Sequence, residues 1–148
     1  MEEQKYPFKL TQPTSRYEFW SRSEEKEVKK IVIFTKVGNE EDNFYNLALL
    51  DELANGELSD ISESRNNDMK IILATVFGIA NDFLTKNPDA VIAFRGSDVR
   101  RHRLYRIALN REIDRLSDFF YISGAINGEY FPFDATLHYD YYLIEKII

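Results

Sequence analysis

The chain has 148 residues, of which 44% are hydrophobic and 14% aromatic, and its formal net charge is −6. This length and composition predict a single globular domain over residues 1–148 and exclude a disordered chain. The acidic balance argues against general affinity for nucleic acid, and the lack of cysteine excludes disulfides and thiol chemistry and suits a cytoplasmic protein.

The first part of the chain predicts strands. The opening MEEQKYPFKL has no apolar core, so we expect no signal peptide, and no apolar run approaches membrane-spanning length. In RYEFWSR the rings of Tyr17 and Phe19 occupy alternate positions, as in a strand with one buried face. We therefore expect an antiparallel meander with strands at Tyr6–Leu10, Arg16–Arg22, Lys30–Val37 and Asn43–Leu50.

The middle of the chain predicts a polar loop and then a long helix. Residues Asn55–Asn67 form an ordinary solvated loop in this interpretation, and Asn66 or Asn67 caps the helix that follows. Over Asp68–Thr85 the apolar residues recur at the i, i+3, i+4, i+7 spacing of an amphipathic helix. The apolar stripe predicts core packing and comprises Met69, Ile72, Leu73, Val76, Phe77, Ala80, Phe83 and Leu84.

A short strand, a Gly-Ser-Asp turn and an arginine-rich helix follow, and this is where we expect a site. The apolar run Val91–Arg95 predicts a strand that lies parallel to an earlier one through a right-handed crossover. Gly96 allows a close backbone approach, and Ser97 or Asp98 can cap the next helix. We expect that helix over residues 98–110, and a continuation to residue 117 stays open.

Arginine dominates this helix. Residues 95–115 hold seven arginines against three acids, a local net charge of +4. The free N–H groups and the dipole at a helix start favour an anion. Helical spacing places Leu104, Ile107 and Ala108 on the inward face, whereas the residues expected to face outward are His102, Arg103, Arg106 and Asn110.

Arg101 is the exception, because the spacing places this charged side chain on the inward face. A charge there needs a carboxylate or carbonyl partner, or a ligand anion. One interpretation is that Arg101 pairs with an internal carboxylate and ties the helix to the sheet. In the other, the candidate anion-binding residues are Arg95, Gly96, Ser97, Arg101 and Arg103.

The last part of the chain predicts a hairpin and a final strand. Asn127-Gly128 between Phe119–Ile126 and Glu129–Phe133 favours a type I′ turn. Tyr139–Ile147 is typical of one more strand. The complete order predicts an α+β domain with a mainly antiparallel sheet and two principal helices packed on one face.

No complete catalytic motif is present, so the sequence carries no enzyme assignment. His102 and His138 stand far apart without metal-ligand spacing, and we expect neither a metal site nor a cofactor. Gly96-Ser97 followed by Glu112-Ile113-Asp114 partly matches minimal nucleotidyltransferases. In that family the acidic pair lies on a strand, whereas here it is expected to continue a helix.

Three segments resemble a family of functionally uncharacterised bacterial proteins of about this length, mainly from Bacteroidota. They are TKVGN at Thr35–Asn39, NNDMKIILATV at Asn66–Val76 and GSDVRRHRLYRI at Gly96–Ile107. The family's Gly-Ser and Arg-x-Arg-Leu-Tyr elements are both present. Asp98 and His102 stand where the family has threonine, and Asp98 would repel an anion at the helix start. The resemblance implies no established activity.

Three functions therefore stay open. The first is a small cytoplasmic interaction or regulatory module that binds a protein partner. The second is a protein that binds a phosphate or nucleotide ligand with the Gly96-Ser97 turn and Arg101. The third is nucleic-acid binding through the basic helix 98–111, which the net charge disfavours.

Overall fold

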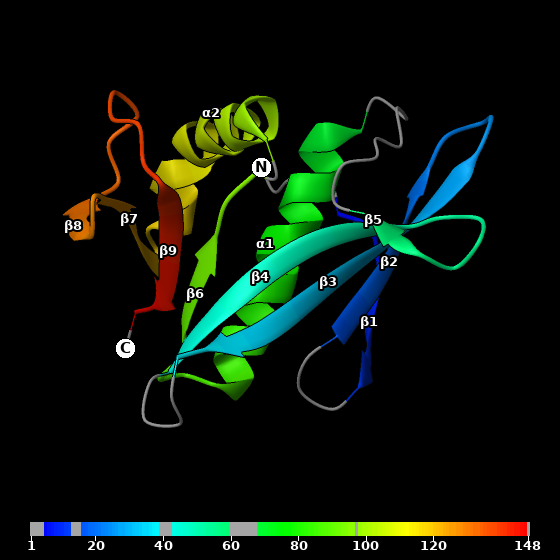
Figure 1. Cartoon of the computed structure of the whole chain (residues 1–148), viewed down its shortest axis with the longest axis horizontal. Coiled ribbons are helices and arrows are strands. Elements are labelled where there is room, and N and C mark those ends of the chain that lie inside the picture. Colours follow the sequence, from blue (N-terminus) through cyan, green and yellow to red (C-terminus); the bar gives the residue numbers. More distant parts are fainter. Residues whose placement is uncertain (1–4, 13–15, 39–42, 60–67, 97, 148) are drawn as a thin grey trace. The chain divides into compact units, whose positions relative to one another are not determined.

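The computed structural model describes residues 5–12, 16–38, 43–59, 68–96 and 98–147. Ser97 and the predicted caps Asn66 and Asn67 lie outside these residues. The helices are α1 (Met69–Lys86) and α2 (Val99–Leu116). The strands are β1 (Phe8–Gln12), β2 (Arg16–Arg22), β3 (Glu27–Val37), β4 (Phe44–Glu52), β5 (Leu58–Ser59), β6 (Val91–Phe94), β7 (Phe120–Ile126), β8 (Glu129–Pro132) and β9 (Tyr141–Lys146) (Figure 1).

Within the described residues the strands form a mixed, mostly antiparallel sheet, which confirms the α+β class. Hydrogen-bonded neighbours follow the order β1-β2-β3-β4-β6-β9-β7-β8, and β5 pairs with β4. β4 and β6 run parallel, with Phe44 opposite Val91 and Asn46 opposite Ala93, as expected for a strand that follows a crossover helix. β5 is a short strand in the segment predicted as loop.

By its contacts the chain divides into two compact units. The first unit comprises residues 1–35 and 47–83, and the second comprises residues 36–46 and 84–148. Each unit contains one helix and its own set of paired strands. The expectation of one domain over residues 1–148 stays a prediction.

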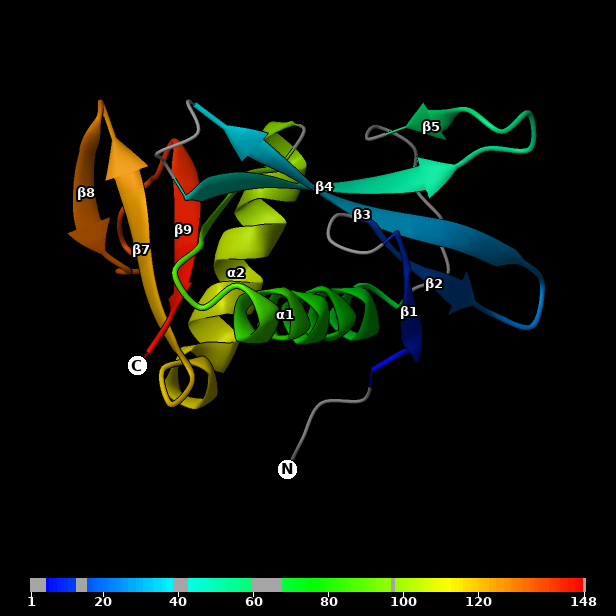
Figure 2. The same ribbon diagram turned by 90° about the horizontal axis from the view of Figure 1, so that it is seen from below.

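In the first unit, α1 packs on strands β1–β3 and the second half of β4 (Figure 2). The alternation predicted for β2 is confirmed, because Tyr17 and Phe19 are each 1% exposed whereas Trp20 is 41% exposed. The rings of Phe34 on β3 and Phe83 on α1 stack with centroids 4.0 Å apart. No helix among the described residues is long and apolar enough to cross a membrane.

Polar side chains in this unit are paired as burial requires. The carboxylate of Asp68, just before α1, accepts hydrogen bonds from Tyr6 Oη at 2.5 Å and Ser21 Oγ at 2.6 Å. Tyr17 Oη donates to Asp82 at 2.6 Å, and burial of the Tyr17 ring raises the pKa of its phenol. These bonds join the strands to both ends of α1, because a buried polar group without a partner is costly.

A buried ion pair joins β3 to β4 in the same unit. Lys30 Nζ lies 2.5 Å from Asp51 Oδ1, and the two side chains are only 7% and 6% exposed. Each buried charge is stabilised by the opposite charge of its partner, because water cannot solvate either group.

In the second unit, β6, β9, β7 and β8 lie side by side and α2 packs on one face of them (Figure 1). The hairpin between β7 and β8 confirms the Asn-Gly prediction, since Asn127 and Gly128 have φ values of 52° and 82°. Both positive angles are those of a type I′ turn.

The inward face predicted for α2 is partly wrong. Ala108 is 3% exposed, but Ile107 is 45% exposed, whereas His102, which was expected to face outward, stacks on Tyr142 of β9. The fully buried residue of the helix is Leu109. The inward stripe is therefore rotated toward His102 and Leu109, because aromatic rings of the sheet give the imidazole a place to pack.

Candidate functional site

Asp98 is the N-cap residue of α2, and its side chain satisfies a free N–H group at the start of the helix. Asp98 has extended backbone angles, and its Oδ1 accepts a hydrogen bond from the Arg101 backbone N–H at 2.8 Å. Asp98 Oδ2 lies 3.0 Å from Nη1 of the Arg101 side chain, which is 12% exposed. Arg101 is thus largely withdrawn from solvent, and one carboxylate that it pairs with belongs to the N-cap residue of its own helix.

Gly96 is required by the close approach of α2. A Cβ atom at this position would lie 2.1 Å from the backbone nitrogen of His102 and 2.6 Å from the carbonyl carbon of Arg101. Backbone atoms cannot move aside as a flexible side chain can. Gly96 therefore brings the first turns of α2 against the end of β6.

His102 joins three segments of the second unit. Its Nδ1 accepts the Gly96 N–H at 3.1 Å, so Nε2 carries the ring proton and donates to the Tyr139 carbonyl at 2.6 Å. Its ring also stacks on Tyr142 with centroids 4.9 Å apart. These partners assign the neutral imidazole with the proton on Nε2.

The basic hollow lies beside this histidine. Its volume is about 310 Å³, and its walls come from the end of β6, the first two turns of α2 and the segment that leads into β9. The lining residues are Arg95, Gly96, Asp98, Val99, His102, Arg103, Arg106, His138, Tyr139, Asp140 and Tyr142. Of the predicted site residues, Arg95, Gly96 and Arg103 meet here, whereas Arg101 is not among those that line it.

In the basic hollow the acidic side chains have partners, whereas two of the arginines have none among the described residues. Asp98 is held by Arg101, and Asp140 Oδ2 accepts the Asn127 backbone N–H at 2.9 Å. The described residues include no ion-pair partner for the guanidinium groups of Arg95 and Arg103. The acids are therefore engaged and two arginines are available, so the hollow favours an anion.

Arg106 adds a third guanidinium, which lies against the ring of His138. Arg106 Nη1 lies 3.1 Å from His138 Nδ1. Because a guanidinium can only donate, this contact is a hydrogen bond when Nδ1 of His138 carries no proton. This hydrogen bond positions Arg106, and its positive charge is not neutralised by the imidazole.

Two tyrosines form the floor. Tyr139 Oη donates to the Pro132 carbonyl at 2.7 Å and accepts the Asp134 N–H at 2.8 Å, which fixes the ring over Gly124. A Cβ at Gly124 would lie 2.2 Å from that ring. Burial raises the pKa of Tyr142 to about 12, against the opposing effect of the Arg106 charge. The floor is therefore uncharged and rigid at neutral pH.

The partial nucleotidyltransferase match has no matching geometry. Glu112 and Asp114 lie on α2, and the Glu112 carboxylate is 3.0 Å from Arg115 and 3.5 Å from Arg111. Among the described residues no group of three or more His, Asp or Glu side chains is arranged to hold a metal ion.

Sequence reasoning missed the C-terminal wall of the basic hollow. His138, Tyr139 and Tyr142 come from the segment that pairs with β6 through Phe94 and Tyr142. No local pattern marks these residues, since their place depends on that long-range strand pairing.

Comparison with known proteins places the chain in a family. A family model described as a family of unknown function (DUF6934) matches residues 2–147. No curated protein and no solved structure matches the chain.

Proposed function

The chain belongs to a family of unknown function (DUF6934), and from the geometry of the basic hollow we propose that it binds a small anionic ligand through a phosphate group. The observation that carries this proposal is the pair of guanidinium groups, Arg95 and Arg103, that line the hollow without an ion-pair partner among the described residues. Planar guanidinium groups bind phosphate with paired hydrogen bonds.

The hollow has the features that a phosphate ester needs. Arg106, positioned by His138, supplies a third cation from the next turn of α2. Val99, which is 88% exposed, also lines the hollow and offers an apolar surface for the organic part of the ligand. Of the predicted turn and Arg101, Gly96 and Arg101 contribute by shaping the helix start, where the Asp98 carboxylate already accepts the Arg101 N–H group.

A titration with inorganic phosphate, nucleotides and short oligonucleotides tests the proposal. The melting temperature of the wild type should rise with ligand concentration, because a ligand that binds only the native state stabilises it. Arg103→Gln should weaken binding by about tenfold, as expected for the loss of one charge-assisted hydrogen bond. Arg111→Gln is the matched control, since it removes the same charge from an exposed position of α2 outside the hollow.

Two outcomes would contradict phosphate binding. One is a wild type that none of these ligands stabilises. The other is equal weakening by Arg103→Gln and Arg111→Gln, which would indicate a general charge effect. Oligonucleotide binding with a steep dependence on salt would instead support the nucleic-acid alternative on helix 98–111.

A protein-interaction module is the second candidate. Val99 and Ile107 on α2 are apolar side chains with 88% and 45% exposure. They flank Arg103 along the helix, and an exposed apolar and basic ridge suits a protein partner. Ile107→Ser should weaken such an interaction, because it removes exposed apolar surface, and leave phosphate binding through Arg95 and Arg103 intact, since Ile107 is not among the residues that line the basic hollow.

The cellular setting is also part of the proposal. The Gly-Ser and Arg-x-Arg-Leu-Tyr elements support a bacterial, Bacteroidota-type origin. The lack of cysteine supports a cytoplasmic location. Mass spectrometric detection of the chain in the cytoplasmic fraction of such a bacterium would test both.

A further inference from the structure

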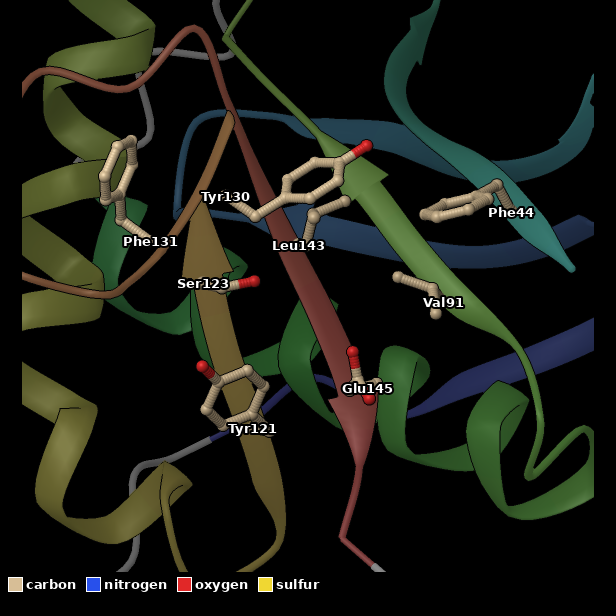
Figure 3. A pocket seen from close by; sticks show the side chains of 8 residues that line it. All are labelled: Phe44, Val91, Tyr121, Ser123, Tyr130, Phe131, Leu143 and Glu145. Atoms are coloured by element: carbon tan, nitrogen blue, oxygen red, sulfur yellow. The ribbon is translucent and has the colours of Figure 1, made fainter. Parts of the chain in front are cut away.

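A second hollow lies in the second unit (Figure 3), and the alternation of side chains along β9 places it on the sheet face away from the basic hollow. Neighbouring residues of β9 line the two hollows: Tyr142 lines the basic one, and Leu143 and Glu145 line the other. This follows from the period of two in a strand, which sends alternate side chains to opposite faces. We call the second hollow, of about 190 Å³, the sheet pocket.

Aromatic rings stand around the sheet pocket. Val91 lies opposite both Phe44 and Glu145, and Glu145 lies opposite Tyr121, so strand register places these side chains in one row. Tyr130 of β8 adds another ring (Figure 3). Tyr121 and Tyr130 are 48% and 56% exposed, so their faces are open to a ligand.

Among the described residues that line this pocket, Glu145 carries the one carboxylate, and it is partly buried. The described part of the chain contains no ion-pair partner for it. The adjacent Lys146 is engaged elsewhere, because its Nζ donates to Thr85 Oγ1 at 3.3 Å. A carboxylate that loses part of its hydration beside aromatic and aliphatic groups is stabilised by a cation.

We propose that the sheet pocket binds an alkylated ammonium group. The faces of Phe44, Tyr121 and Tyr130 attract a positive charge through their quadrupoles, and Glu145 neutralises it. The aliphatic floor of Val91 and Leu143 suits methyl groups rather than a fully hydrated ammonium. The volume is roughly six times that of one molecule in liquid water, which accommodates a trimethylammonium group.

This site is separate from the basic hollow and does not depend on the proposed function. It lies on the other face of the sheet, and its described lining residues differ from those of the basic hollow and carry the opposite charge. A phosphate group would be repelled by Glu145 here, whereas a cation would be repelled by Arg95 and Arg103 there.

Choline titrated into the full chain, followed by amide NMR shifts, tests this inference. Saturable shifts are expected at residues 91, 121 and 145, and they should be absent with the uncharged analogue of choline in which carbon replaces the ammonium nitrogen. A peptide that carries trimethyllysine is titrated in parallel. Binding of choline indicates a free metabolite, and binding of the peptide alone indicates the side chain of another protein.

Two substitutions and their matched controls locate the site. Tyr121→Leu and Glu145→Gln should each weaken binding, by about two- to tenfold, because each removes one attractive contact with the cation. Phe119→Leu and Glu129→Gln change exposed residues of the same kinds outside the pocket and should leave binding unchanged. Glu145→Gln keeps the shape of the side chain, so it carries the test if Tyr121→Leu does not fold.

The proposal is overturned if neither choline nor the peptide gives saturable shifts at these residues. It is equally overturned if the uncharged analogue binds as well as choline, or if Glu145→Gln binds choline as tightly as Glu129→Gln does.

Discussion

Replacement of Asp51 by asparagine is expected to destabilise the chain strongly, because it leaves the charge of Lys30 buried without its counter-charge. Asparagine has nearly the same size as aspartate, so the substitution removes charge and little else. In the wild type the two groups are 2.5 Å apart and their side chains are 7% and 6% exposed. Water therefore cannot take the place of the lost carboxylate.

The size of the effect follows from this burial. Removing one partner of a buried pair typically costs about 3–5 kcal/mol. For a chain of this size such a loss corresponds to a fall in melting temperature on the order of 10 °C. Urea denaturation of Asp51→Asn and wild type, with equal slopes, measures the difference in the free energy of unfolding.

Two further variants separate burial of charge from other causes. The double substitution Lys30→Met with Asp51→Leu removes both charges, and its stability should return to within about 1 kcal/mol of the wild type. Glu27→Gln breaks the Arg22–Glu27 pair, whose side chains are 58% and 55% exposed. It should cost no more than about 1 kcal/mol. Similar small losses for Asp51→Asn and Glu27→Gln would refute the reasoning.

Two more outcomes are expected in the second unit. Gly96→Ala should lower the free energy of unfolding by at least about 2 kcal/mol, because its Cβ would overlap the backbone of α2 at Arg101 and His102. An unchanged urea midpoint would show that the helix start can move aside. Burial raises the pKa of Tyr142 to about 12. The Tyr142 phenol should therefore stay protonated in the native state at a pH near 10, where an unfolded tyrosine ionises. Above that pH the native state binds more protons than the unfolded state, so stability should fall by up to about 1.4 kcal/mol per pH unit until about pH 12. This loss should shrink in Tyr142→Phe, and an equal loss in that variant would assign it to other groups.

Local signals in the sequence were sufficient for most of the elements, but not for the short strand β5. The hairpin at Asn127-Gly128 was predictable because two successive positive φ angles are needed and few residue pairs provide them. The parallel direction of β6 was predictable because a helix must separate parallel neighbours, whereas its partner β4 was not. In both cases the physical cause lies within the segment itself or in its order along the chain.

The candidate site depends on contacts that no segment contains by itself. Periodicity treated His102 as a polar residue and turned it outward, whereas the ring of Tyr142 and the backbone of Gly96 hold it inward. The wall of the basic hollow at His138 is 32 residues from its partner Arg106. Such a pairing follows from the neighbouring positions of β6 and β9, and strand order was the part of the fold that the sequence left open.

The contact between Gly124 and Tyr139 has a consequence for how related sequences can diverge. The ring occupies the space that any Cβ at position 124 would need, and its hydroxyl holds the backbone at Pro132 and Asp134. A side chain can therefore be accepted at 124 only where a smaller residue stands at 139, and that replacement gives up both hydrogen bonds. The two positions should therefore covary in the family: either both are conserved or both change.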